Sequence, residues 1–339
     1  MMVFDDSTER DDTDETATPM LFGRVLDGQG AGRPIDWEAA KQWQPTVAGE
    51  VLWVHLCRNR PGVVEWLEEL GVPEPTRELL TSDRTRPRAF REGNTLVATM
   101  RGINFNPGAE PEDMLSMQLW CDGQRLVTLR RDPLQTPRHV LRMIDQSAMG
   151  PTDCGALITE LSEAMITRMS SAIIDMNDHI DQLEERDPED DPEGMLDKIS
   201  TIRRNCLGLK RHMGPMHEAL EAISRYAPPW FEDHDRREIS ESIDRLKRYL
   251  EDIDISKESA VVLQDELRAR AVAGSERATY MLTIVAGIFL PLGFITGLLG
   301  INVGGMPGVD SHAAFWIVTG ACLAIIAAMM ALFRYWKWL

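Results

Sequence analysis

Two charge-free runs near the C-terminal end constrain this chain more than any other feature. Residues 280–300 and 313–333 each comprise 21 residues without Asp, Glu, Lys or Arg. At 1.5 Å per residue, about 20 helical residues cross the ~30 Å hydrocarbon layer of a bilayer. A buried helix of a soluble protein is the alternative, but two such runs standing together favour membrane spans. We therefore expect a membrane protein with two transmembrane helices.

The basic residues around these runs predict their orientation. Arg268, Arg270 and Arg277 precede the first run, Arg334 and Lys337 follow the second, and the loop between them has neither Lys nor Arg. The positive-inside rule therefore places the loop outside and both termini in the cytoplasm. The first residues lack the basic start and apolar core of a signal peptide, which agrees with this topology. Aromatic residues suited to the membrane interface are Tyr280, Trp316, Tyr335, Trp336 and Trp338.

Charge and motif content narrow the possible partners. The formal net charge of −18 favours cations and disfavours nucleic acid. No GxxxxGK[ST] loop or HExxH motif is present, so the sequence predicts no nucleotide, no cofactor and no enzymatic activity. The five cysteines are scattered without a CxxC pair, a pattern typical of a reducing compartment.

The region before the first run combines strands and long helices. Segments 51–58, 95–105 and 117–131 predict strands, the last as a hairpin around Asp122-Gly123. Strands are not expected beyond Pro151. The sequence thus predicts an α/β domain followed by a helical domain.

Three long helices are expected in the helical domain. The first starts with Thr152 or Asp153 as N-cap, and the second runs from about Glu193 to Arg225. The third is expected over residues 236–290, on the order of 80 Å long, because no proline interrupts it. A packing seam with alternating spacings of four and three is formed by Ile239, Ile243, Leu246, Leu250 and Ile253.

A stripe of small and polar residues then runs up this helix into the first span, and we expect it to continue the heptad register of the seam. Its members are Asp265, Ala269, Val272, Glu276, Thr279, Thr283, Ala286, Leu290, Gly293, Gly297 and Gly300. Bulky residues occupy the opposite face. Close helix packing through Gly293 and Gly297 would explain a small stripe, but the acids at 265 and 276 favour an axis that carries cations. Because a two-helix hairpin cannot enclose a pore, such an axis requires a ring of subunits.

The loop after the first span carries a resemblance to a known family. The span ends in Gly300-Ile301-Asn302, and the chain closes with a basic aromatic tail. This pattern resembles the CorA family of divalent-cation transporters, whose signature is Gly-Met-Asn, and it departs from that signature at Ile301. Further segments resemble the ZntB zinc-transport branch: "TRPR" (85–88), "GPTDCG" (150–155), "VGGMPG" (303–308) and "KWL" (337–339).

The resemblance implies a homopentamer with a cytoplasmic funnel and a pore lined by the first span. It implies a selectivity filter at Gly300, Ile301 and Asn302, where five amide groups would meet the waters of a hydrated cation. A helix C-cap is the alternative role for Asn302. Rings of Asp265 and Glu276 would attract cations at the inner mouth, unless these acids only pair with Lys257, Arg268 or Arg277.

Other candidate metal ligands give weaker signals. His312, outside near the pore mouth, is a weak zinc candidate. His212 and His217 flank Gly214-Pro215, which we expect to disturb helical spacing, so an incidental pair is favoured over a zinc site. The acids of residues 187–193 fit a solvated hairpin tip better than a metal site, and His55 fits a core or surface position.

The sequence predicts an α+β membrane protein, and the resemblance implies that it lies in the bacterial inner membrane and transports divalent cations, above all Zn²⁺, with Cd²⁺, Ni²⁺ and Co²⁺ as further cargo. Uptake is favoured, and coupling to protons stays open. A Mg²⁺/Co²⁺ channel and a membrane-anchored coiled-coil scaffold or sensor also stay open. The expected parts are a disordered acidic tail (1–19), the α/β domain (20–150), the long-helix funnel (151–278), the first span (279–300), the external loop (301–312), the second span (313–333) and the cytoplasmic tail (334–339).

Overall fold

The computed structural model describes residues 18–109, 113–147, 150–186, 191–301 and 312–336. The chain divides into two compact units. The first unit comprises Met1–Gln264 and the second comprises Asp265–Leu339.

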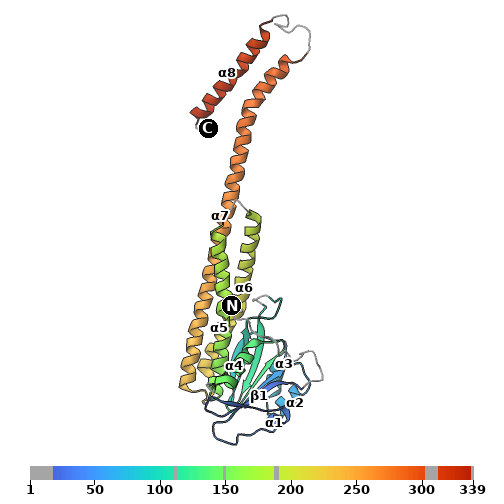
Figure 1. Ribbon diagram of the computed structural model, residues 1–339, viewed down its shortest axis with the longest axis vertical. Coiled ribbons are helices and arrows are strands. Elements are labelled where there is room, and N and C mark those ends of the chain that lie inside the picture. The colour runs from blue at the N-terminus through green and yellow to red at the C-terminus, as the bar shows by residue number, and fades with distance from the viewer. Residues whose placement is uncertain (1–17, 110–112, 148–149, 187–190, 302–311, 337–339) are drawn as a thin grey trace. The chain divides into compact units, whose positions relative to one another are not determined.

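A seven-stranded sheet organises the first unit (Figure 1). The strands lie in the order β2-β1-β3-β7-β6-β5-β4, and every neighbouring pair is antiparallel except β3 and β7. Their bounds are β1 (Met20–Leu26), β2 (Gly32–Pro34), β3 (Val51–Cys57), β4 (Arg88–Glu92), β5 (Thr95–Gly102), β6 (Leu115–Cys121) and β7 (Arg125–Arg130).

The predicted strands are confirmed. The expected segments 51–58 and 95–105 contain β3 and β5, and the expected hairpin is formed by β6 and β7. Asp122 holds its turn, because its Oδ1 accepts hydrogen bonds from the backbone N–H groups of Gln124 (2.8 Å) and Arg125 (2.7 Å). Strands β1, β2 and β4 were not expected from the sequence.

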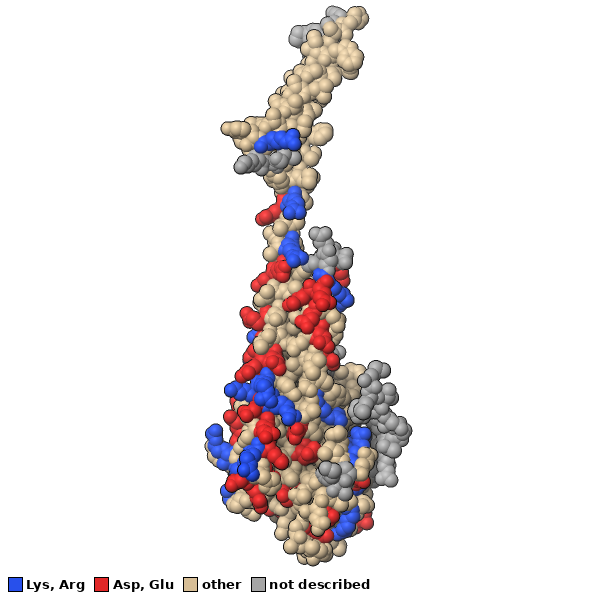
Figure 2. Space-filling view, turned by 60° about the vertical axis from the view of Figure 1, so that its left-hand side comes forward, with Lys and Arg blue, Asp and Glu red and all other residues tan. Residues whose placement is uncertain are grey.

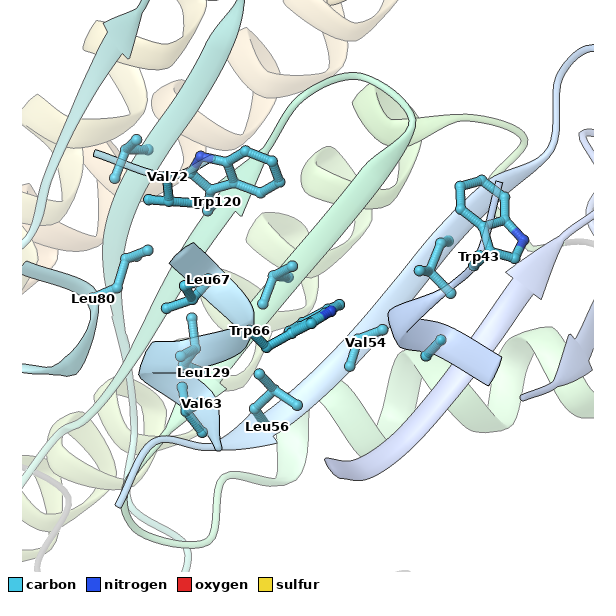
Figure 3. Close-up of a cluster of buried hydrophobic side chains, with 14 of the residues drawn as sticks. Trp43, Val54, Leu56, Val63, Trp66, Leu67, Val72, Leu80, Trp120 and Leu129 are labelled. Carbon is cyan, nitrogen blue, oxygen red and sulfur yellow. The ribbon is translucent and has the colours of Figure 1, made fainter. Parts of the chain in front are cut away.

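Three short helices cover one face of the sheet: α1 (Trp37–Lys41), α2 (Val63–Glu69) and α3 (Glu74–Thr81). Figure 3 shows Trp66 and Leu67 of α2 beside Leu56 of β3 and Leu129 of β7. These side chains are at most 1% exposed. Burial of each large apolar side chain contributes roughly 1.5–3 kcal/mol, so this layer anchors α2 to the sheet.

Helices α4 (Gln135–Ser147), α5 (Cys154–Glu184) and α6 (Pro192–Tyr226) follow the strands in sequence. Helix α5 lies against β5, and α6 lies against β4 and β5. Asp153 is the N-cap of α5 and accepts a hydrogen bond from Ala156 N at 2.9 Å, which confirms the expected helix start. Asp191 caps α6 in the same way through Gly194 N at 3.0 Å.

The long helix α7 (Asp233–Leu299) contributes residues to both units. In the first unit it packs beside α5 and α6 (Figure 1), and ion pairs join Lys210 to Asp254 (2.6 Å) and Arg245 to Glu163 (3.1 Å). Of the expected seam, Ile239, Leu246 and Ile253 are buried and Ile243 and Leu250 are half-buried. The predicted packing seam is confirmed.

Helix α7 includes the expected stretch 236–290 and continues through Pro291 to Leu299, close to the end expected for the first span. Helix α6 matches the expected second helix, and it continues through Gly214-Pro215, which were expected to disturb its helical spacing. The expectation about the heptad register of α7 is wrong. The buried repeat of α7 continues as Ala260 and Leu267, seven residues apart, whereas Asp265 lies two residues before Leu267. The stripe that starts at Asp265 therefore does not continue the heptad register of the seam.

The second unit contains the end of α7 and helix α8 (Ala314–Tyr335). Both helices are long and apolar enough to cross a membrane. In each helix, no residue of the most apolar stretch is buried inside the chain. Figure 2 shows acidic and basic side chains crowded over the first unit and almost none over the two candidate spans. Within the second unit, α8 lies beside the end of α7 (Figure 1).

Candidate functional site

One face of the first span is covered by α8. The half-buried residues of this part of α7 are Ile284, Gly287, Ile288, Leu292 and Ile295, so they repeat about once per helical turn. This spacing places them on a single face of the helix. The rest of this part of α7 is exposed in the single chain.

Helix α8 presents a matching face with the same periodicity: Ala314, Val318, Cys322, Ile325, Met329 and Phe333. Phe333 is 7% exposed, and its Cζ would lie 3.3 Å from a Cβ added at Gly287. The missing side chain of Gly287 therefore lets the Phe333 ring approach the α7 backbone. Small residues at helix contacts are typical of membrane helix pairs, which associate through close packing.

The stripe of small and polar residues faces away from α8. At ~100° per residue, Ala286, Gly293 and Gly297 lie roughly opposite Ile288. Thr279, Thr283, Ala286, Leu290, Gly293 and Gly297 are all exposed. A Cβ added at Gly293 or Gly297 would meet no atom within 4 Å. The chain's own second span thus leaves this face uncovered.

The threonines of the span have their hydroxyl groups satisfied by the backbone. Thr283 Oγ1 donates to Thr279 O at 2.8 Å, and Thr296 Oγ1 donates to Leu292 O at 2.9 Å. Neighbouring backbone carbonyls satisfy such hydroxyls at little cost in an apolar layer. Pro291 lacks an N–H, so the carbonyl of Gly287 has no partner at the usual helical position.

Two acids lie on the same side of α7 before the span. Asp265 and Glu276 are eleven residues apart, which is about three turns and ~16 Å along a helix. Both are exposed, and within the described residues neither forms a salt bridge. The pairings with Lys257, Arg268 or Arg277 that would neutralise them are not formed there. Their charges remain open to solvent in the single chain.

The expected filter lies at the limit of the described residues. Gly300 follows α7 directly, and its N–H donates to Gly297 O at 3.2 Å. Ile301 is 48% exposed. Asn302 lies outside the described residues, so its predicted role stays a prediction. His312, at the other end of the loop, is exposed.

The remaining histidine candidates are placed by the fold in other roles. Arg101 Nη1 lies within hydrogen-bond distance of both ring nitrogens of His212, at 3.1 Å from Nδ1 and 3.2 Å from Nε2. His217 is five residues further along α6, on a different side of the helix. Burial and the neighbouring Arg101 lower the pKa of His212 to about 4. His55 is 1% exposed and lies 2.9 Å from Thr128 Oγ1. The buried position of His55 is one of the two positions expected for it from the sequence.

An α/β unit, a bundle of long helices and a helix that leads into the first of two apolar candidate spans define a class: membrane proteins with a large N-terminal unit and two C-terminal candidate spans. Comparison with known proteins identifies the family. The profile described as "CorA-like Mg2+ transporter protein" matches residues 48–335. The chain therefore belongs to the CorA-like family of divalent-cation transporters.

Relatives of known name match over nearly the whole chain. The divalent cation transporter CmaX of Pseudomonas aeruginosa is 34% identical, with 94% of each chain covered. The zinc transport protein ZntB of Pectobacterium atrosepticum is 32% identical over 93% of this chain and 94% of its own. The solved structure of full-length CmaX superposes with a TM-score of 0.82 at 32% identity, over 94% of this chain and 98% of that one.

More distant structures share the fold. The CorA magnesium transporter of Methanocaldococcus jannaschii superposes with a TM-score of 0.78 at 14% identity, over 94% of this chain and 99% of that one. The resemblance noted from the sequence is thereby confirmed for the family, for the α/β unit with its long helix, and for the two candidate spans.

Proposed function

We propose that the protein carries Zn²⁺ into the cell through a pore at the axis of a homopentamer in the bacterial inner membrane. The names of the ZntB relatives, at about 30% identity over most of the chain, support zinc as cargo. Cd²⁺, Ni²⁺ and Co²⁺ are further cargo on chemical grounds, because the same ligand types suit them. Both termini lie in the cytoplasm, as the Lys and Arg residues around the spans favour.

The uncovered stripe of α7 is the observation that carries this proposal. A span that faces only lipid gains nothing from glycines and threonines on its outer side, since bulky apolar groups suit the acyl chains. Here Thr283, Ala286, Gly293 and Gly297 form the side that α8 leaves open. In a ring of five chains, this side faces the axis, and Leu290 supplies the narrowest apolar level.

The ion crosses this pore with its water shell. Zn²⁺ bound directly by proteins prefers His, Cys or carboxylate ligands, and residues 277–309 contain none of these types. The filter at Gly300, Ile301 and Asn302 therefore contacts the hydration shell through amide and carbonyl oxygens. A neutral ring binds weakly enough for release, as conduction requires. Selectivity among divalent transition metals is modest for the same reason.

The membrane potential favours uptake. A charge gains about 2.3 kcal/mol per 100 mV, so a divalent cation gains ~4.6 kcal/mol on entry into an inside-negative cell at that voltage. The exposed carboxylates of Asp265 and Glu276 raise the local cation concentration at the inner mouth. Coupling to protons adds a second driving force when the pH gradient is inward.

The experiment reconstitutes the purified protein in vesicles with a trapped Zn²⁺ indicator. An inside-negative voltage is expected to drive Zn²⁺ entry, and an inward proton gradient to increase it. Asn302→Ala is expected to abolish most of this flux while the particle keeps five times the 38.2 kDa chain mass. Flux of Mg²⁺ but not Zn²⁺ would establish a magnesium channel instead. A dimer without flux would establish the scaffold or sensor.

A further inference from the structure

Three side chains that are distant in sequence meet where α5 and α7 begin, inside the first unit. Asp153 is the N-cap of α5, and His234 and Asp235 lie in the first turn of α7. One ligand atom from each of the three lies within 4.8 Å of the others. Metal ligands in a tetrahedral Zn²⁺ site are about 3.3 Å apart, so a small side-chain adjustment closes this group around one ion.

Asp235 is the member that most needs a partner. Its side chain is 0% exposed. Oδ2 accepts a hydrogen bond from Glu232 N at 2.8 Å, but Oδ1 is buried and has no hydrogen-bond partner of acceptable geometry. His234 Nε2 lies 3.1 Å from Oδ1 and pairs with it electrostatically only when the imidazole is protonated. A buried carboxylate oxygen without a hydrogen bond costs free energy, which a cation at this point would offset.

The local backbone makes room for this carboxylate. A Cβ at Gly155 would overlap the carboxylate of Asp235. Glycine at this position therefore allows Asp235 to lie directly against the first turn of α5. Both Asp153 and Gly155 belong to the "GPTDCG" segment, which the transport pathway does not use.

The two other members have free capacity. Asp153 uses Oδ1 to accept from Ala156 N, and Oδ2 has only a 3.5 Å contact with Thr152 Oγ1. The His234 side chain is 44% exposed, so solvent reaches the group from its side. Its Nδ1 lies 3.8 Å from Glu232 Oε2, the type of carboxylate partner that orients a metal-binding imidazole.

We propose that Asp153, His234 and Asp235 form a binding site for one divalent transition-metal ion per chain, with solvent water as the fourth ligand. One imidazole nitrogen and two carboxylate oxygens suit Zn²⁺ and Co²⁺, whereas Mg²⁺ prefers oxygen ligands alone. The two carboxylates balance the charge of the ion. The site lies in a different unit from the transport pathway and does not depend on the proposed function.

The test measures metal binding by the full-length protein in detergent, after removal of metals by a chelator. Co²⁺ is titrated while its visible absorption is recorded, and Zn²⁺ is then used to displace it. The parent is expected to bind one Co²⁺ per chain with a spectrum of nitrogen and oxygen ligands. His234→Gln and Asp153→Asn are expected to weaken this binding at least tenfold. Asn is as good an N-cap as Asp, so the second variant keeps the start of α5 intact.

The matched control is His179→Gln, which removes an exposed histidine elsewhere on α5 and is expected to leave Co²⁺ binding unchanged. Equal binding by the parent and His234→Gln would overturn the proposal. A strong thiolate charge-transfer band would also overturn it, because it would assign the ion to the buried Cys121 and Cys154 nearby. Mg²⁺ is expected not to displace Co²⁺ at comparable concentration.

Discussion

Gly297→Leu tests whether the uncovered face of α7 lines the ion path. In the single chain a Cβ at this position would meet no atom within 4 Å, so the substitution meets no neighbour at its first atom. Leucine is also favoured over glycine in a helix by roughly 0.8–1 kcal/mol. Stability of the α7–α8 pair is therefore not expected to fall. Any loss of transport must arise where the copies of the chain come together.

In a fivefold ring, the substitution would place five isobutyl groups at one level of the axis. This would turn a glycine-lined level into an apolar constriction that excludes a hydrated ion. We expect Zn²⁺ flux to fall at least ~100-fold, which corresponds to about 2.7 kcal/mol added to the barrier. Gly297→Ala should show an intermediate loss.

The assay is initial Zn²⁺ flux into vesicles, normalised to the amount of assembled protein measured by native mass. Ile295→Leu is the control, because Ile295 is half-buried on the face that contacts α8 and the two side chains are isomers. It should transport within about twofold of the parent. If Gly297→Leu assembles normally and transports like the parent, the small stripe does not face the path. Loss of assembly would instead assign the stripe to helix packing.

Three further predictions address other parts of the molecule. The double variant Asp265→Asn with Glu276→Gln should reduce Zn²⁺ flux about tenfold at low ionic strength and much less at physiological salt, where charges are screened within ~8 Å; equal flux at every salt concentration would contradict the electrostatic role. Phe333→Ala should lower the thermal midpoint in detergent, and the loss of unfolding free energy should be smaller than the ~3–5 kcal/mol typical of a soluble core. Phe315→Ala should leave the midpoint unchanged, because the Phe315 side chain is 69% exposed. His212 has its pKa lowered from 6.5 to about 4, so the unfolded chain binds its proton first and stability is lost as pH falls from about 6.5 towards 4; His212→Gln should flatten this part of the stability curve, and an unchanged slope would refute the assignment.

Much of the fold was readable from local sequence patterns. Strands β3, β5 and the β6–β7 hairpin are apolar runs bounded by turn residues, and they appear at the expected positions. Strand β4 escaped prediction because its sequence, RAFRE, carries the charged side chains typical of a sheet edge. Strand β2 has only three residues, too few for a periodic pattern.

The helix ends depended on information beyond local propensity. Proline often interrupts helices in water, so the absence of proline predicted a continuous helix only over residues 236–290, and the charge-free run predicted the span up to residue 300. In an apolar layer the helix is the only open-ended structure that satisfies its own backbone, and it tolerates Pro291 for that reason. Helix α6 likewise continues through Pro215, and this helix packs against β4 and β5.

The sequence predicts the stripe of α7 but not the proposed metal site. The small stripe of α7 follows from helical periodicity alone, but only the fold shows that α8 covers the opposite face and leaves this one open. The group of Asp153, His234 and Asp235 could not be found from the sequence, because about 80 residues separate its two parts. No sequence pattern near Asp235 predicts that its carboxylate is buried. Gly155, which leaves space for this carboxylate, lies on α5 rather than on α7.

Accessibility of single cysteines to a charged thiol reagent tests the central claim most directly. Thr283→Cys lies on the uncovered stripe, and Ile284→Cys lies next to it on the face that contacts α8. Vesicles carrying each variant are treated with a positively charged methanethiosulfonate reagent, and Zn²⁺ flux is compared with that of the treated parent, which has only its native cysteines. The pore account predicts that the reagent strongly inhibits Thr283→Cys and that excess Zn²⁺ slows the reaction, while Ile284→Cys stays at the level of the parent. Inhibition of Ile284→Cys without inhibition of Thr283→Cys would contradict it.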